Sequence, residues 1–99
     1  MKKVFFHSDA SAEIKASAIW YERKQPDLGK RFLAAIQDDI QRIQINPLLY
    51  PEIMPSIHRS ITRSFPFGVV YKVNEDDIHI YAVMHLHRDP YYWKIRLTE

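Results

Sequence analysis

Apolar residues in the first half of the chain recur at the spacing of a helix face. Between residues 10 and 24 they stand at Ala10, Ile14, Ala18 and Tyr21, with Ile19 and Trp20 beside them. Between residues 28 and 45 they stand at Phe32, Ile36, Ile40 and Ile43. This spacing predicts two helices over residues 10–24 and 28–45, and the short link between them predicts an antiparallel hairpin.

The residues at the ends of these stretches predict how the helices begin and end. Ser8 or Asp9 offers a side-chain oxygen that caps the first helix, and Glu13 suits the positive end of the helix dipole. Asn46-Pro47 ends the second helix, because proline lacks the N–H that a helix interior requires.

From residue 57 onward the pattern changes to strict alternation, which is typical of strands. It covers residues 57–63, 67–73 and 78–85, with a turn over residues 74–77. Residues 3–7 predict a short first strand, and residues 48–55 a proline-containing connector. The expected fold is α+β with the order β-α-α-β-β-β. A helical hairpin packs on a small antiparallel sheet, and a short C-terminal segment follows.

One face of such a sheet lies under the helices, while the other need not be covered. We place on the covered face Phe67, Val69, Ile80 and Ala82. Alternation then assigns to the open face Gly68, Val70, Tyr81 and His85. His85 is therefore expected on the open face, at the end of a rigid strand.

The composition suits one folded domain over residues 1–99, since 46% of the residues are apolar and 26% are charged. The chain has no cysteine, which excludes disulfides, thiolate metal sites and cysteine nucleophiles and fits a cytoplasmic location. The apolar run at the N-terminus stops at His7, and no stretch approaches the length of a membrane span. We expect no membrane partner.

The formal net charge is only +2, so the placement of the charges says more than their sum. Between His85 and Arg96 the chain carries two imidazoles, two guanidiniums, one lysine and three aromatic rings. This mixture suits a surface that grips phosphate and stacks on bases. A solvated cap at the end of a small domain has the same composition, so both interpretations stay open.

Several short motifs follow one another along nearly the whole chain. They are Ala10-x-x-Glu13-Ile14, Trp20-Tyr21-Glu22, Leu28-Gly29-x-x-Phe32, Ile43 to Pro47, Arg59, Phe65-Pro66-Phe67-x-Val69-x-Tyr71, and Ala82-Val83-x-His85-x-x-Arg88-x-Pro90-x-x-Trp93-x-x-Arg96. In this order and spacing they resemble the RelE/ParE superfamily of type II toxin–antitoxin toxins. The resemblance is to the ParE-like, or plasmid stabilisation, branch in particular.

The resemblance implies a growth-inhibiting toxin that a cognate antitoxin neutralises. RelE-like members cut mRNA in the ribosomal A site, whereas ParE-like members are described as inhibitors of DNA gyrase. In RelE-like nucleases an arginine commonly lies three residues before the tyrosine that matches Tyr71, and this chain has Gly68 there. The expected function is a gyrase-directed, non-catalytic toxin. The alternatives are a ribosome-dependent mRNA endonuclease and a degenerate, non-toxic family member.

A metal-independent nuclease would need an acid or base and cations around the phosphate. His85 would supply the acid or base, Tyr92 would stack on a base, and the cations would be Arg59, Arg63 and Arg88. Further candidates for binding are His87, Tyr91, Trp93 and Arg96.

Structural roles compete with each of these. His85 fits equally well a residue that holds the C-terminal segment through a hydrogen bond to Asp89 or to a backbone carbonyl. Trp93 fits a hydrophobic plug, and Arg88 and Arg96 fit partners of helix carboxylates. Trp20 and Tyr21 fit helix packing or a groove that an antitoxin covers.

We expect no metal, no cofactor and no small-molecule substrate. His85-x-His87 with Asp89 has a spacing that a metal can use, but a chain without cysteine offers few further ligands. The expected partners are therefore a cognate antitoxin protein and, as the target, either DNA gyrase or the ribosome with its mRNA.

Overall fold

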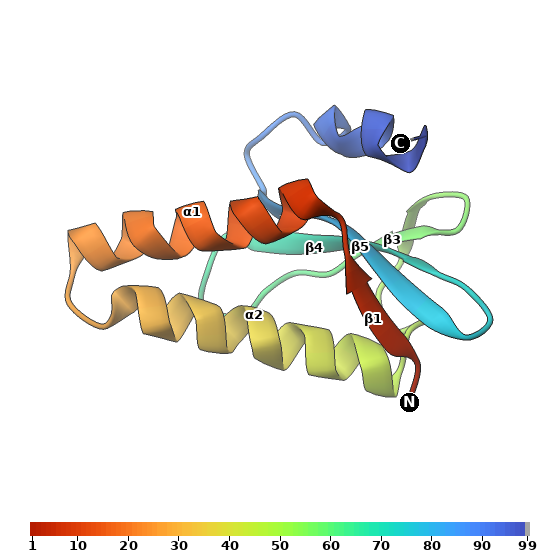
Figure 1. The fold of residues 1–99 in the computed structure, drawn as a ribbon, viewed down its shortest axis with the longest axis horizontal. Helices are drawn as coiled ribbons and strands as arrows, with labels where there is room; N and C mark the ends of the chain where they lie inside the picture. The colour runs from red at the N-terminus through yellow and green to blue at the C-terminus, as the bar shows by residue number, and fades with distance from the viewer. Residues whose placement is uncertain (99) are drawn as a thin grey trace.

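The computed structural model describes residues 1–98, in which two long helices cover one face of a five-stranded sheet (Figure 1). The elements in chain order are β1 (Lys3–Phe6), α1 (Ser8–Lys24), α2 (Leu28–Ile45), β2 (Glu52–Met54), β3 (Ile57–Arg59), β4 (Phe67–Val73), β5 (Asp77–His85) and the 3-10 helix η1 (Tyr92–Thr98). The predicted α+β class, the helical hairpin and the C-terminal segment are confirmed. Within residues 1–98, no helix combines the length and the apolar character that a membrane crossing requires.

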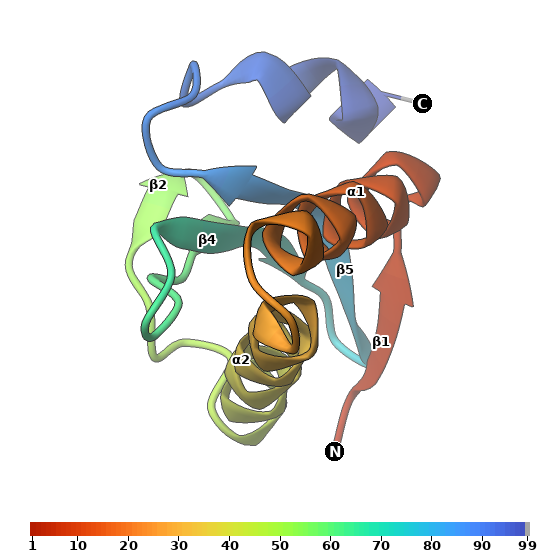
Figure 2. The same ribbon diagram turned by 90° about the vertical axis from the view of Figure 1, so that its left-hand side faces the viewer.

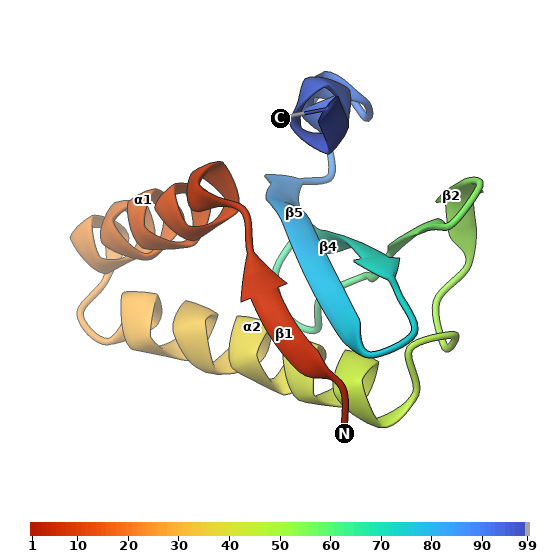
Figure 3. The ribbon, with the colours of Figure 1, turned by 45° about the vertical axis from the view of Figure 1, so that its right-hand side comes forward.

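The sheet differs from the expected one at both edges. Its strand order is β1-β5-β4-β3-β2, and β1 runs parallel to β5, as Figure 3 shows. A parallel pair requires a long crossover, and the helices and strands between β1 and β5 supply it. The short strand β2 forms within the segment that we expected to be a connector, and it pairs with β3.

The start of α1 corrects the predicted cap. The helix begins at Ser8, and its N-cap is His7, whose Nδ1 accepts the N–H of Asp9 at 3.0 Å. Neither Ser8 nor Asp9 is the cap, because both already have helical positions in the first turn. An imidazole nitrogen thus satisfies one of the N–H groups that every helix leaves unpaired at its start.

The link between the helices is held by the side chain of Glu22. Its two carboxylate oxygens accept the N–H groups of Asp27 at 2.9 Å and Gly29 at 3.0 Å, so this residue of α1 caps the start of α2. A Cβ on Gly29 would lie 2.5 Å from the carbonyl oxygen of Ala18. The helices can cross this closely only because residue 29 is glycine.

Two apolar cores lie on opposite faces of the sheet. The first, under the helices, contains among others Phe32, Ile36, Val69, Tyr71 and Ile80. The second lies under η1 and consists of Ile57, Val70, Ala82, Met84 and Trp93. Figure 2 shows η1 and α2 on opposite sides of β4 and β5. The face that we expected to stay open is therefore partly covered by η1.

A β-bulge in β5 changes which residues face the helices. Val70 pairs with Ala82, but the next residue, Tyr71, pairs with Ile80, so Tyr81 is an extra residue in β5. From the bulge onward the alternation is shifted by one residue. Our assignment of Ala82 to the covered face is therefore wrong, since Ala82 lies in the second core. Our assignment of His85 to the open face is wrong for the same reason.

A buried carboxylate fastens α2 to the strands. Asp39 Oδ2 accepts the hydroxyl of Ser60 at 2.5 Å and that of Thr62 at 3.0 Å. The hydroxyl oxygen of Ser60 in turn accepts the N–H of Val69 at 2.9 Å. A buried carboxylate requires hydrogen-bond donors, and here the hydroxyls of Ser60 and Thr62 supply them. The same bonds hold the chain between β3 and β4 against both α2 and the sheet.

Alkaline pH should destabilise the fold through Tyr71. This residue is fully buried, and its hydroxyl donates to the carbonyl oxygen of Pro47 at 2.8 Å. Burial raises the pKa of its phenol from 10.0 to about 12. The folded protein then holds this proton more tightly than the unfolded chain does. The contribution of Tyr71 to the free energy of unfolding is therefore complete below the usual pKa of the phenol and is lost as the pH rises through the raised pKa. We expect a loss of about 1.4 kcal/mol from this group at about pH 11.

Urea unfolding of the wild type and of Tyr71→Phe at a series of pH values measures this loss. The variant should be less stable at neutral pH, by about 1 kcal/mol for the lost hydrogen bond, and should lose less stability in alkali. A variant profile as steep as that of the wild type contradicts the prediction.

Candidate functional site

The carboxylate of Glu13, on α1, receives hydrogen bonds from β5 and from η1. Oε1 accepts the N–H of Val83 at 3.1 Å and Nη1 of Arg96 at 2.9 Å. Oε2 accepts Nη2 of Arg96 at 3.1 Å and the hydroxyl of Tyr92. Nη1 of Arg88 lies 3.4 Å from the same oxygen. We call these five residues the Glu13 clamp, and it joins α1, β5 and η1 around one carboxylate.

Arg96 is the main cation of the Glu13 clamp. Its side chain is only 10% exposed, and besides binding Glu13 it donates from Nη1 to the carbonyl oxygen of Tyr81 at 2.8 Å. Burial lowers the pKa of Arg96, but the hydrogen bonds and charge of Glu13 outweigh this effect and raise it. The guanidinium is thus permanently charged and is occupied by partners within the protein.

The ring of Tyr92 lies close to both arginines of the clamp. The guanidinium carbon of Arg88 is 3.6 Å from the centre of its ring, and that of Arg96 is 5.0 Å away. Burial, followed by the hydrogen bond and the charge of Glu13, raises the pKa of Tyr92 far above its usual value. Its phenol therefore stays protonated and donates to Glu13, and both ring and hydroxyl are engaged inside the molecule.

The other aromatic residues of the C-terminal segment divide between core and surface. Trp93 is fully buried in the second core, and its indole N–H donates to the carbonyl oxygen of Pro90 at 2.8 Å. No base can stack on Trp93 while η1 is in place. Tyr91, by contrast, is 45% exposed, and Nζ of Lys94 lies 5.6 Å from its ring centre. Tyr91 and Lys94 are thus among the accessible residues of this segment.

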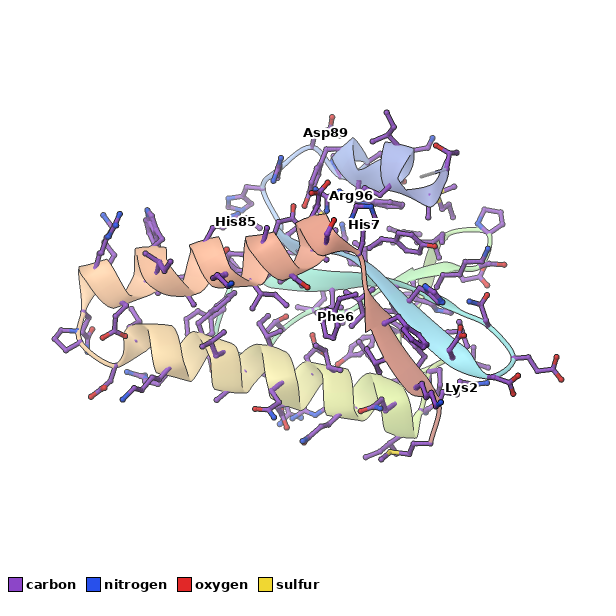
Figure 4. The ribbon with its side chains drawn as sticks, in the orientation of Figure 1. Lys2, Phe6, His7, His85, Asp89 and Arg96 are labelled. Atoms are coloured by element: carbon purple, nitrogen blue, oxygen red, sulfur yellow. The ribbon has the colours of Figure 1, made fainter. Side chains whose placement is uncertain are left out.

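His85, labelled in Figure 4, lies on the side of the sheet that faces α1. Its ring packs edge to face with that of Phe67, with 5.4 Å between the ring centres. Its Nδ1 accepts the N–H of His87 at 3.1 Å. The hydrogen bond that we considered between His85 and Asp89 does not form, because Asp89 instead accepts the N–H of Tyr91 at 3.0 Å. No hydrogen bond or ion pair within residues 1–98 joins the ring of His85 to the arginines that we grouped with it.

Arg59 and Arg63 lie apart from the Glu13 clamp. Arg59 ends β3, and Arg63 is exposed in the loop between β3 and β4. Within residues 1–98, no hydrogen bond or ion pair connects either side chain to Tyr92 or Arg88. The residues that we predicted as one catalytic set are therefore distributed over both faces of the sheet. Nor do residues 1–98 contain a group of three His, Cys, Asp or Glu side chains that could hold a metal ion.

Gly68 occupies a position that no larger residue fits. A Cβ placed on it would lie 2.5 Å from the carbonyl oxygen of Ser60 and 3.0 Å from Cγ of Arg59. The side chain of Arg59 crosses the strand at this point. Because β3 and β4 lie this close together, an arginine has no room at position 68. Backbone packing thus explains why this chain lacks the arginine that RelE-like nucleases commonly carry at the matching position.

The sequence analysis missed the role of Glu13. We interpreted this residue only as a partner of the helix dipole, and its real partners lie up to 83 residues away along the chain. A signal was present, since Glu13 is next to Ile14 on the apolar side of the helix, and a carboxylate there needs donors. The sequence indicated helix carboxylates as possible partners of Arg96, but it did not identify Glu13 as that carboxylate or Tyr92 as a further donor.

The protein is a small α+β protein with a helical hairpin on a mixed sheet and a C-terminal segment held by the Glu13 clamp. Comparison with known families identifies the family to which it belongs. Residues 4–90 match the family model described as "ParE toxin of type II toxin-antitoxin system, parDE". Because this match spans most of the chain, the chain belongs to the ParE toxin family, and this membership implies an antitoxin as its partner. The match ends before η1 begins.

Among solved structures, the chain is similar to one titled "Chromosomal ParDE TA system from P. aeruginosa". The two chains are 18% identical and superpose with a TM-score of 0.62, covering 86% of this chain and 96% of the other. At this identity the likeness shows the fold alone. A search of curated proteins finds no match.

Neutralising the Glu13 carboxylate should release η1. Glu13→Gln keeps the size of the side chain but leaves Arg96 without its counter-charge, and we expect a loss of about 2–4 kcal/mol in the free energy of unfolding. Trp93 fluorescence, followed in a Trp20→Phe background, should shift to the red as its indole becomes exposed. As a matched control, Glu75→Gln in the exposed turn should change stability by less than about 0.5 kcal/mol. Equal stability of the two variants contradicts the prediction.

Adding one methyl group at position 68 should also destabilise the protein. In Gly68→Ala the Cβ meets the carbonyl oxygen of Ser60, so β3 and β4 must separate, and we expect a loss of about 1–3 kcal/mol. Chemical denaturation of the purified variant measures it. An unchanged denaturation midpoint would show that the strands can separate without loss of stability, and it would contradict the packing explanation for Gly68.

Proposed function

We propose that this protein is the toxin component of a type II toxin–antitoxin module and that it arrests growth by inhibiting DNA gyrase without catalysing a reaction. A cognate antitoxin neutralises it. The cytoplasm is the proposed site of action, since gyrase acts there. Membership of the ParE toxin family supports the toxin role.

The observation that carries the non-catalytic mechanism is the collision at Gly68. Phosphoryl transfer to a 2′-hydroxyl develops negative charge, which cations aimed at the phosphate must stabilise. One such cation has no room at position 68, because a Cβ there lies 2.5 Å from the carbonyl oxygen of Ser60. This packing argues against a nuclease.

The environment of the other candidate groups agrees with this interpretation. Tyr92 donates its only hydroxyl proton to Glu13, and Arg96 is occupied by Glu13 and by the carbonyl oxygen of Tyr81. His85, the candidate acid or base, faces α1, on the other side of the sheet from the second core. An active site needs such groups within hydrogen-bond reach of one substrate atom, and these are not.

The exposed side of η1 is the surface that we assign to the target. Tyr91 is 45% exposed and Ile95 is 70% exposed, and Lys94 lies between them along the chain. Tyr91 directly precedes η1, which carries Lys94 and Ile95. An aromatic ring, an aliphatic side chain and a cation this close together are typical of protein interfaces.

The decisive experiment is tightly regulated expression without antitoxin, with gyrase supercoiling and mRNA ends measured in parallel. We expect growth arrest, inhibition of supercoiling by the purified protein, and unchanged mRNA ends. New mRNA ends at ribosomal A sites would instead establish a RelE-like nuclease. Normal growth with a folded protein would identify a non-toxic family member.

Substitutions of exposed apolar residues test the assigned surface. Ile95→Ser and Tyr91→Ala should weaken inhibition of gyrase about tenfold, because each removes contact area at an interface without touching the core. Leu48→Ser is the matched control, since Leu48 is 72% exposed but lies between α2 and β2. Equal inhibition by Ile95→Ser and Leu48→Ser would remove η1 from the contact.

A further inference from the structure

The two edges of the sheet differ in how they are protected from pairing with a further strand. The short strand β2 lies between Pro51 and Pro55, and its register against β3 is irregular. Prolines and bulges are usual ways of blocking an exposed edge. β1 forms the other edge, as Figure 3 shows, and it has neither device. Its last three residues are Val4, Phe5 and Phe6.

The backbone of β1 presents unpaired groups on its outer side. The N–H of His7 donates to the carbonyl oxygen of Ile80 in β5 at 2.8 Å. Because this direction alternates along a strand, Phe5 also turns its backbone groups to β5, whereas Val4 and Phe6 turn theirs to the free side. These outward N–H and C=O groups are available to a strand that lies beside β1.

Apolar side chains surround this free edge. Phe5 is 48% exposed and Phe6 42% exposed, and they lie on opposite faces of the sheet. On the helix side, Phe6 borders a groove that continues over the helical hairpin along Ile14, Ile19 and Leu33. An exposed apolar surface beside an unpaired strand is typical of a protein interface.

We propose that two copies of this chain associate in solution through antiparallel β1 strands, so that their two five-stranded sheets join into one. The two-fold axis passes at Phe5 and is perpendicular to the sheet. Both η1 helices therefore lie on one face of the joined sheet and both helical hairpins on the other. The pairing uses none of the residues assigned to the target, so it holds whether or not gyrase is inhibited.

The strand complements itself in this register. Val4 of one copy faces Phe6 of the other in a hydrogen-bonded pair, and the symmetric pair forms on the other side of the axis. All the outward backbone groups of Val4 and Phe6 are then paired. Phe5 meets its own counterpart in the non-hydrogen-bonded pair, where cross-strand side chains lie closest.

Charges at the ends of β1 agree with the same register. The axis places Lys3 opposite His7 of the second copy, and Asp9 lies beside that histidine, with its carboxylate 4.0 Å from Nδ1 of His7. Asp9 is also 3.7 Å from Arg96 of η1, so it lies on the face to which Lys3 points. No hydrogen bond or ion pair within residues 1–98 engages the ammonium of Lys3. Each copy thus offers a cation to a carboxylate of the other.

Sedimentation equilibrium of the intact protein tests the association. Because a strand this short buries little area, we expect a weak dimer, with a mass that rises with concentration from 11.8 kDa toward twice that value. Val4→Pro removes an outward N–H and leaves the bonds to β5 in place, so it should weaken the association about tenfold. A monomer at every concentration overturns the proposal, and so does undiminished association of Val4→Pro.

A single cysteine tests the position of the axis, since the chain has none of its own. The Cα atoms of a non-hydrogen-bonded pair lie about 4.5 Å apart, a distance that a disulfide can span. Under mild oxidation Phe5→Cys should form a covalent dimer at least about tenfold faster than Ile61→Cys. Ile61 is as exposed as Phe5 but lies in the loop between β3 and β4. Equal rates would overturn the axis at Phe5.

Charge reversal tests the antiparallel register. Lys3→Glu and Asp9→Lys each bring like charges together and should weaken self-association about fivefold, whereas an equimolar mixture of the two variants restores both ion pairs and should associate as the wild type does. Lys24→Glu makes the same charge change at the far end of α1 and should have no effect. A mixture that associates no better than the single variants, with buried Trp93 showing that both are folded, would overturn the pairing.

Discussion

A carboxylate that is largely withdrawn from water has to be surrounded by donors, and the donors around Glu13 come from distant parts of the chain. The N–H of Val83 belongs to β5, and the guanidinium of Arg96 and the hydroxyl of Tyr92 belong to η1. If η1 moved away, Glu13, Arg96 and Tyr92 would lose their partners. The side chain of Glu13 therefore couples the helices on one face of the sheet to η1 on the other.

The bulge in β5 depends on the same group of residues. Tyr81 is the extra residue, its carbonyl oxygen accepts a hydrogen bond from Arg96, and the N–H of Val83 donates to Glu13. Two peptide groups of β5 at and near the bulge thus have partners in the Glu13 clamp. The shift of alternation turns His85 toward α1, where it lines a pocket together with Trp20 and Phe67.

The helices and the main strands could be predicted because their apolar periodicity is a local property, and residues 28–45 form α2 as the spacing indicates. The bulge could not be predicted, because one extra residue leaves the composition and the local apolar pattern nearly unchanged. Only the pairing of β5 with β4 reveals it. The parallel β1 and the partners of Glu13 depend on contacts between the two ends of the chain. The C-terminal run that we singled out as a candidate site mixes buried and exposed side chains, and Trp93 and Arg96 are buried in it. Buried and exposed members cannot be separated without the fold.

Trp93 completes the second core from a stretch that the ribosome makes after all the strands. While residues 92–98 are still in the exit tunnel, Met84 and Val70 have no cover and Glu13 has no guanidinium, so the domain cannot mature progressively from its N-terminus. Maturation has to wait until this stretch emerges. The surface that η1 carries therefore appears only after every strand of the sheet has been made.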